Sequence, residues 1–181
     1  MNFYILQKPE AYWGDYGDIL IHGMSAYAER VDGKIQLYRT GPFIPPISFP
    51  GICDVVVTNE FRTLLSDHFK DLTFLPVVKA HIATVNWEEW DTSVDDPLYY
   101  PESGEPEDYI LGKPNDPVSA NKMGALWELV VPEVQIASEI SDWARISGNR
   151  RVIVSERVKT LLEGNVAKWV RLQFIPTDWL R

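Results

Sequence analysis

The sequence contains little cysteine and no long hydrophobic run, and both shortages limit the classes of protein to which it can belong. A single cysteine, Cys53, excludes an intramolecular disulfide framework. No stretch approaches the roughly 18 consecutive apolar residues of a membrane-spanning helix, and the N-terminus lacks the basic start and apolar core of a secretory signal. We therefore expect a soluble, cytoplasmic protein that does not associate with a membrane.

Motifs for cofactor, metal or nucleophilic chemistry are also missing. The three histidines, His22, His68 and His81, are scattered without the spacing of metal ligands. The chain has no glycine-rich phosphate-binding loop and no Gly-x-Ser-x-Gly turn. We therefore expect no cofactor, no metal site and no catalytic residues.

Basic residues are absent from residues 80–112, although this segment holds nine acids. The chain has 26 acidic and 17 basic residues, so the 17 acids outside the segment balance the bases and the net charge of −9 belongs to the segment alone. A concentrated negative field attracts a cationic partner and disfavours direct binding of nucleic acid.

Aromatic residues are interleaved with these acids, and exposed aromatic side chains beside charges are typical anchors of protein interfaces. The sequence therefore predicts a partner-binding surface on this segment. The candidate residues are Trp87, Glu88, Glu89, Trp90, Asp91, Asp95, Asp96, Tyr100, Glu102, Glu105, Glu107, Asp108 and Tyr109.

Other interpretations of the acidic segment stay open. Its tryptophans can close over the core while the acids are simply solvated. Paired carboxylates also act as general acid and base, so residues 95–108 could serve a small hydrolase or a sugar-processing enzyme. A structural adaptor is a third alternative. Two carboxylates that converge in an enclosed pocket would favour the enzyme, whereas acids spread along an open face would favour a binding protein.

The chain repeats one phrase. Residues 54–65 read "DVVVTNEFRTLL", and residues 151–162 read "RVIVSERVKTLL". The two phrases align without a gap, and further along the chain "FLPV" at residues 74–77 corresponds to "FIPT" at residues 174–177.

Each copy has the pattern of a strand followed by a capped amphipathic helix. The runs at residues 55–57 and 152–154 are short, β-branched and apolar on both faces, which is typical of buried central strands. Thr58 and Ser155 can each cap a helix through the side-chain hydroxyl. Apolar residues at three-and-four spacing, including Leu64 and Leu161, predict a core-facing side on each helix, and Gly164 predicts the end of the second helix. A further strand follows each helix.

These patterns predict an α+β fold, with mixed or antiparallel sheets and two similar strand-helix-strand units packed around one core. Residues 1–50 are assigned to an N-terminal β-hairpin region, because Asp32-Gly33 separates two alternating runs and favours a tight turn. Residues 51–181 are assigned to an α+β body with the internal repeat at 54–78 and 151–178. The two regions are expected to form one compact domain.

Both copies together resemble a family of bacterial polymorphic-toxin immunity proteins that was formerly described as a domain of unknown function. The resemblance rests on Ser155, Glu156 and Arg157 at the helix start and on Phe174, Ile175 and Pro176 in the following strand, and it covers residues 54–181. It implies an immunity protein that binds and occludes a cognate toxin domain in the producing cell. It implies no catalysis. The acidic segment, and not the resemblance, predicts that the active site of this toxin is basic.

Overall fold

The structure is a computed structural model that describes residues 2–10, 17–25, 29–51, 53–89, 105–135, 141–148, 151–167 and 171–177. Strands and helices are both abundant, and the predicted α+β class is confirmed. The elements are β1 (Phe3–Glu10), η1 (Asp18–His22), β2 (Gln36–Gly41), β3 (Ile47–Ser48), β4 (Val56–Thr58), α2 (Asn59–His68), β5 (Thr73–Pro76), β6 (Val78–Thr84), α3 (Pro106–Gly112), α4 (Pro117–Lys122), β7 (Leu126–Val130), β8 (Glu133–Val134), β9 (Trp143–Ile146), β10 (Val152–Ser155), α5 (Glu156–Val166) and β11 (Arg171–Pro176).

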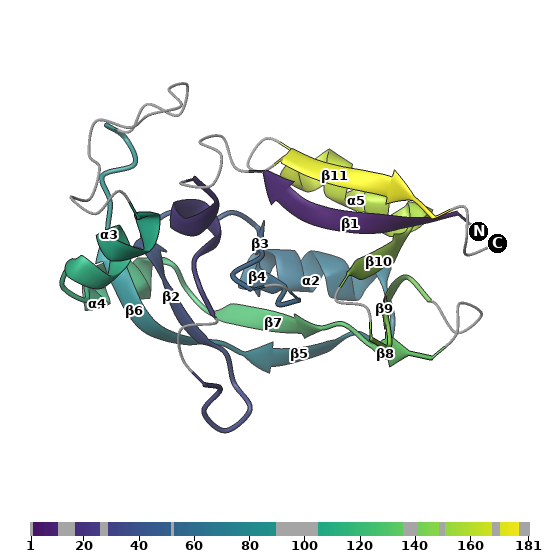
Figure 1. Ribbon diagram of the computed structural model, residues 1–181, viewed down its shortest axis with the longest axis horizontal. Coiled ribbons are helices and arrows are strands. Elements are labelled where there is room, and N and C mark those ends of the chain that lie inside the picture. Colours follow the sequence, from purple (N-terminus) through teal and green to yellow (C-terminus); the bar gives the residue numbers. More distant parts are fainter. Residues whose placement is uncertain are drawn as a thin grey trace.

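The strands form three sheets. The first sheet has the order β3-β4-β7-β5, the second has the order β11-β1-β10-β9-β8, and a small sheet pairs β2 with β6. In Figure 1, β5 and β7 of the first sheet lie below α2, and β1 and β11 of the second sheet lie above it.

Both predicted strand-helix-strand units are present. The first unit is β4-α2-β5 and the second unit is β10-α5-β11. Thr58 and Ser155 are the N-caps, and their hydroxyl oxygens accept hydrogen bonds from the backbone amides of Phe61 and Val158. Each cap thereby satisfies one of the amides that a helix N-terminus leaves unpaired.

The helices bury equivalent faces. Leu65 and Leu162 are fully buried, whereas Leu64 and Leu161 are partly buried and pack against the edge of the same core. The second helix does not end at Gly164, as the sequence predicts, but continues to Val166. The extra turn places the Val166 side chain in the core with no exposed surface, so burial of an apolar residue outweighs the low helix propensity of glycine.

Each unit holds a third strand between its own two strands. In the first sheet β7 separates β4 from β5, and in the second sheet β1 separates β10 from β11. Both inserted strands run antiparallel to their neighbours. The two sheets share one register: Trp127 lies opposite Val57 and Pro76, and Tyr4 lies opposite Val154 and Pro176.

The inserted strands are exchanged between the two halves of the chain. The first half of the chain contains β1, β3 and the first unit, and the second half contains β7, β9 and the second unit. Nevertheless, β1 belongs to the second sheet and β7 belongs to the first sheet. Strands β3 and β9 also occupy equivalent places, beside β4 and β10. The chain is therefore a duplicated unit in which each half contributes one strand to the sheet of the other.

One core joins the two sheets and both helices. The largest cluster of buried apolar side chains includes Val57 and Leu129 from the first sheet, Val154 from the second, and Leu65 and Leu162 from the helices. We call this cluster the main core. Strand β1, from the predicted N-terminal region, lies in the middle of the second unit and belongs structurally to the body.

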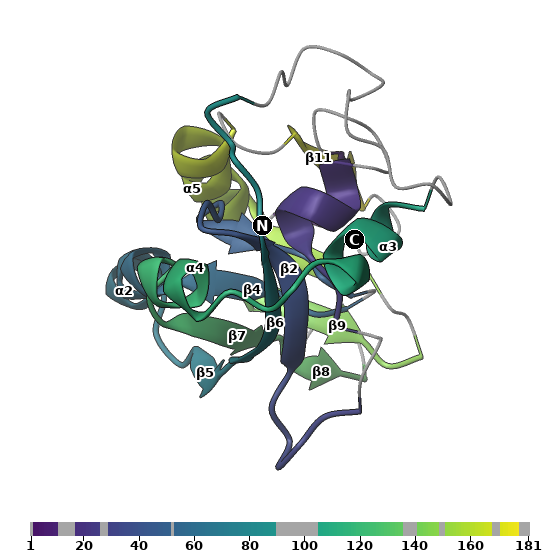
Figure 2. The ribbon, with the colours of Figure 1, turned by 90° about the vertical axis from the view of Figure 1, so that its left-hand side faces the viewer.

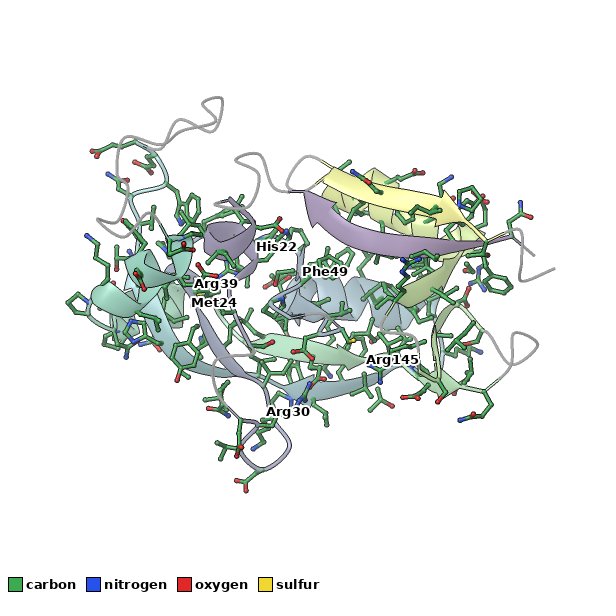
Figure 3. All side chains as sticks on the ribbon, viewed as in Figure 1. His22, Met24, Arg30, Arg39, Phe49 and Arg145 are labelled. Carbon is green, nitrogen blue, oxygen red and sulfur yellow. The ribbon has the colours of Figure 1, made fainter. Side chains whose placement is uncertain are left out.

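The predicted turn at Asp32-Gly33 is present, and antiparallel bridges join its two sides, between Val31 and Lys34 and between Met24 and Tyr38. Asp32 and Gly33 both have positive φ, 50° and 74°, as a tight reversal requires. Strand β2 then pairs in parallel with β6. Arg30, labelled in Figure 3, holds the turn against the first sheet by donating 2.7 and 2.8 Å hydrogen bonds to the carboxylate of Glu128.

Candidate partner-binding site

The two described ends of the acidic segment are attached to the small sheet. Trp87, Glu88 and Glu89 lie shortly after the end of β6 at Thr84, and α3 packs against β6, β2 and η1. In Figure 1, α3 and β6 lie together at one end of the molecule. Six candidate residues lie outside the described part of the chain: Trp90, Asp91, Asp95, Asp96, Tyr100 and Glu102.

Trp87 fixes the first end of the acidic segment. Its half-buried ring packs against the main core and meets Phe43 edge to face, with 5.6 Å between the ring centres. The next two residues, Glu88 and Glu89, are exposed. The ring of Trp87 therefore supports the position of two carboxylates in solvent, whereas its predicted role in partner binding stays a prediction.

Helix α3 fixes the second end. Pro106 stands in its first turn, where a missing amide costs nothing, and Glu107 and Asp108 stand where the helix dipole favours negative charge. Ile110 is completely buried and Tyr109 is half-buried against the main core. Burial raises the pKa of the Tyr109 hydroxyl, so this side chain is neutral at physiological pH.

The acids of α3 point away from this buried face. Glu105 and Asp108 are exposed and Glu107 is half-buried. We call Glu105, Glu107 and Asp108 the α3 acids. One cation approaches their helix: the Nζ atom of Lys113 lies 5.1 Å from the centre of the Tyr109 ring. The α3 acids therefore stand at fixed positions on a helix that its apolar side anchors.

The sequence did not single out a buried arginine of β2, the strand against which α3 packs. Arg39 of β2, labelled in Figure 3, has no exposed surface, and its burial lowers the pKa of the guanidinium to about 9. Its Nε atom donates to the carbonyl of Thr40 at 2.8 Å, and its Nη2 atom donates to the carbonyl of Phe43 at 2.9 Å. The side chain thus fixes the backbone that carries Phe43 against Trp87. In sequence, Arg39 looks like an ordinary polar position at the end of an alternating run.

Two adjoining cavities of about 480 and 410 Å³ lie elsewhere, near the ends of α2 and β9, and both are lined by His68, Phe69 and Arg157. Arg157 crosses between them: its guanidinium donates to the carbonyl of His68 at 3.1 Å and lies 3.3 Å from the carboxylate of Asp142. The candidate residues that the structure describes do not line these cavities.

The serine of the Ser-Glu-Arg phrase is a structural residue. The Ser155 hydroxyl accepts the amide of Val158 at 3.3 Å and donates to the carboxylate of Asp142 at 2.6 Å, and the residue is fully buried. Both hydrogen-bonding functions of this hydroxyl are therefore used by the fold. This arrangement agrees with the interpretation of Ser155 as a helix cap.

Among the described residues, no three histidine, cysteine, aspartate or glutamate side chains are grouped so that they could hold a metal ion. No helix in the described part of the chain is long and apolar enough to cross a membrane. The acidic loop of the enzyme alternative, residues 95–108, lies largely outside the described ranges, and its described acids are the α3 acids.

Comparisons of this chain with protein-family models, with curated proteins and with solved structures found no match.

Proposed function

We propose that this protein is an immunity protein, which binds a cognate bacterial toxin domain and occludes it without catalysis. One observation carries the proposal. Both described ends of a segment with nine acids and no bases are anchored on β6 and α3, and most of their carboxylates are exposed: Glu88, Glu89, Glu105 and Asp108. The resemblance of residues 54–181 to immunity proteins supports the same conclusion.

The physical mechanism is electrostatic attraction followed by exclusion. A toxin that acts on nucleic acid or nucleotides has a basic cleft, and a concentrated negative field increases the rate at which such a cleft meets its inhibitor. Charges that are held on an anchored helix need little reordering on binding, so less conformational entropy is lost. Aromatic side chains near the acids, such as Tyr109, then supply apolar contact area.

The first experiment asks whether a toxin exists and whether this chain neutralises it. The proposal predicts that the gene immediately upstream encodes a large secreted protein with a variable C-terminal domain. Expression of that domain alone should stop bacterial growth, and co-expression with this chain should restore it. Growth arrest that this chain does not relieve would contradict the proposed function.

The second experiment asks whether the α3 acids make the contact. Changing Glu105→Gln, Glu107→Gln and Asp108→Asn together should slow association with the toxin domain severalfold and flatten the dependence of that rate on salt concentration. The fold should remain stable, because exposed charges contribute little to stability.

A matched control removes the same charge from other places. Glu29, Glu60 and Asp67 are exposed and lie outside the acidic segment, so their change to amides gives a variant of equal net charge. This control should bind as fast as the parent protein. If the α3 variant and the control associate equally fast at low salt, the toxin does not approach through α3.

A further inference from the structure

The exchanged strands create the same arrangement of a cation and an aromatic ring twice. Arg62 of α2 and Lys159 of α5 occupy equivalent positions in the two units. The guanidinium carbon of Arg62 lies 3.9 Å from the centre of the Trp127 ring, and the Nζ atom of Lys159 lies 4.6 Å from the centre of the Tyr4 ring. In both units the ring comes from the inserted strand, and such contacts are attractive cation–π interactions.

An edge strand adds a phenylalanine to each arrangement, beside the cation in the first unit and beside the ring in the second. Phe74 of β5 lies 5.8 Å from the Arg62 guanidinium, and Phe174 of β11 lies 6.4 Å from the Tyr4 ring. The helix start also contacts each ring. Trp127 donates its indole N–H to the Asn59 side chain at 3.1 Å, and the Tyr4 hydroxyl donates to Glu156, which is the equivalent residue.

The charge of the two arrangements differs. Lys159 is neutralised by two carboxylates of its own helix, Glu156 at 3.6 Å and Glu163 at 4.0 Å. The equivalent residues around Arg62 are Asn59 and Ser66, which carry no charge. Arg62 forms no ion pair with any of the described residues. The second unit thus shows how this fold neutralises the cation, and the first unit lacks both groups that do so.

We propose that the first unit binds a carboxylate-bearing segment of a partner protein on this surface. The surface consists of Asn59, Arg62, Phe74, Pro76 and Trp127, and we call it the Arg62 platform. Arg62, Phe74 and Trp127 are half-buried, and Pro76, opposite Trp127, is exposed. The inference does not depend on the proposed immunity function. In Figure 2, α2 lies to one side of β2 and β6 and α3 lies to the other, so the Arg62 platform is separate from the α3 acids.

The chemistry of the Arg62 platform favours a carboxylate over other groups. A guanidinium that lies on a ring keeps N–H donors at its edge, where they match the two oxygens of a carboxylate. The ring also removes water from one side of the charge, which strengthens the interaction with an anion. Arginine and tryptophan are enriched among the residues that dominate protein interfaces.

Two other modes of binding fit less well. Nucleic acid requires several phosphate contacts from lysine or arginine, whereas the Arg62 platform has one cation on a chain of net charge −9. Addition of a strand to β5 is disfavoured because the strand ends in Pro76, which has no amide N–H to donate. The partner therefore binds through side chains.

The test uses two neutral-ended tripeptides, acetyl-Leu-Glu-Leu-amide and its isostere acetyl-Leu-Gln-Leu-amide, added to the ¹⁵N-labelled full chain. The indole N–H resonance of Trp127, assigned with a Trp127→Phe variant, reports binding. The glutamate peptide should shift this resonance saturably at concentrations up to about 10 mM and should bind about tenfold more tightly than the glutamine peptide.

Two variants locate the effect. Arg62→Gln removes the cation, and the double variant Asn59→Glu with Ser66→Glu keeps Arg62 but restores the neutralising carboxylates of the second unit. Both variants should lose the response to the glutamate peptide. Lys159→Gln, in the second unit, is the matched control and should keep it.

Several results would overturn the inference: no shift of the Trp127 resonance, equal binding of the two peptides, or an undiminished response in the double variant. Octathymidylate is the competing probe. A larger response to this oligonucleotide than to the glutamate peptide would assign the Arg62 platform to nucleic acid and would overturn the inference of a protein partner.

Discussion

Leu65→Ala and Leu162→Ala test whether the exchange of strands makes the two halves of the chain one cooperative unit. Both leucines are completely buried at equivalent positions of α2 and α5, and both belong to the main core. Each substitution removes three buried carbons, and at about 0.8 kcal/mol for each the lost transfer free energy is about 2.4 kcal/mol. The cavity left in a core that relaxes only partly raises the expected loss of unfolding free energy to roughly 3–5 kcal/mol.

The melting temperature follows from this loss. For a chain of this length a loss of 1 kcal/mol lowers Tm by about 2–4 °C, so each variant should melt roughly 6–20 °C below the parent protein. Leu64→Ala and Leu161→Ala are the matched controls. Because these side chains are only partly buried, each control should lose less than about 2 kcal/mol.

Urea denaturation measures the free energy of unfolding and thermal denaturation measures Tm, and each is followed by circular dichroism and by tryptophan fluorescence. The decisive observation is the number of transitions. Because β1 lies in the sheet of the second unit and β7 in that of the first, damage to either helix should move one shared transition detected by both probes. If Leu65→Ala instead splits unfolding into two steps, with the second unit unaffected, the reasoning from strand exchange is wrong.

The remaining predictions concern the N-terminal strand, the helix cap and acid stability. Deletion of residues 1–10 should remove hydrogen-exchange protection from those β10 amides that bond to β1 and not to β9; protection of the β1-facing amides in the deletion variant would contradict the assigned topology. Ser155→Ala should cost roughly 1–2 kcal/mol in urea denaturation and Thr58→Ala about 1, since Ser155 also donates to Asp142; equal losses would show that this second bond contributes nothing. The hydroxyls of Thr84 and Ser119 lower the pKa of Asp116 to about 2. The charged Asp116 side chain therefore stabilises the fold above the unfolded pKa of 3.8, and this contribution is lost as the pH falls toward 2. Asp116→Asn should make the urea midpoint less dependent on pH across that interval.

The repeated phrase was enough to predict the local structure of both units. Strand, cap and helix depend on neighbouring residues, so the valine runs and the hydroxyls of Thr58 and Ser155 indicate them directly. The end of α5 was predicted wrongly at Gly164, because the burial of Val166 depends on tertiary packing that a short sequence pattern does not contain.

The exchange of strands could not be predicted from the repeat. The inserted strands share little sequence: β1 begins "FYIL" and β7 reads "LWELV", and each lies far along the chain from the unit that it joins. A match of an aromatic residue followed two positions later by leucine is too short to recognise. Register supplies the missing information, since Tyr4 and Trp127 are seen to be equivalent only when each lies opposite its valine and proline.

For the candidate site, the sequence predicts where the acidic residues lie, but it does not predict the buried contacts that hold them in place. Nine acids without a base are visible by counting. The buried face of α3 and the hydrogen bonds of Arg39 are not, because they depend on η1, β2 and β6 meeting in space. The uncompensated charge of Arg62 is likewise visible only beside Lys159, whose two carboxylates define what the first unit lacks.

The two units separate the residues that maintain the fold from those available for function. Equivalent core positions keep their character: Val57 and Val154, like Leu65 and Leu162, are the same residue type and are fully buried. These positions are constrained because each sheet contains a strand from the other half of the chain, so a destabilising change in one half also destabilises the other. Exposed positions have no such constraint, and there the units differ in charge, as between Ser66 and Glu163. A change of charge at a surface position whose core neighbours are unchanged affects the stability of the fold only slightly, and these differences converge on the one cation of the Arg62 platform, the surface proposed for binding.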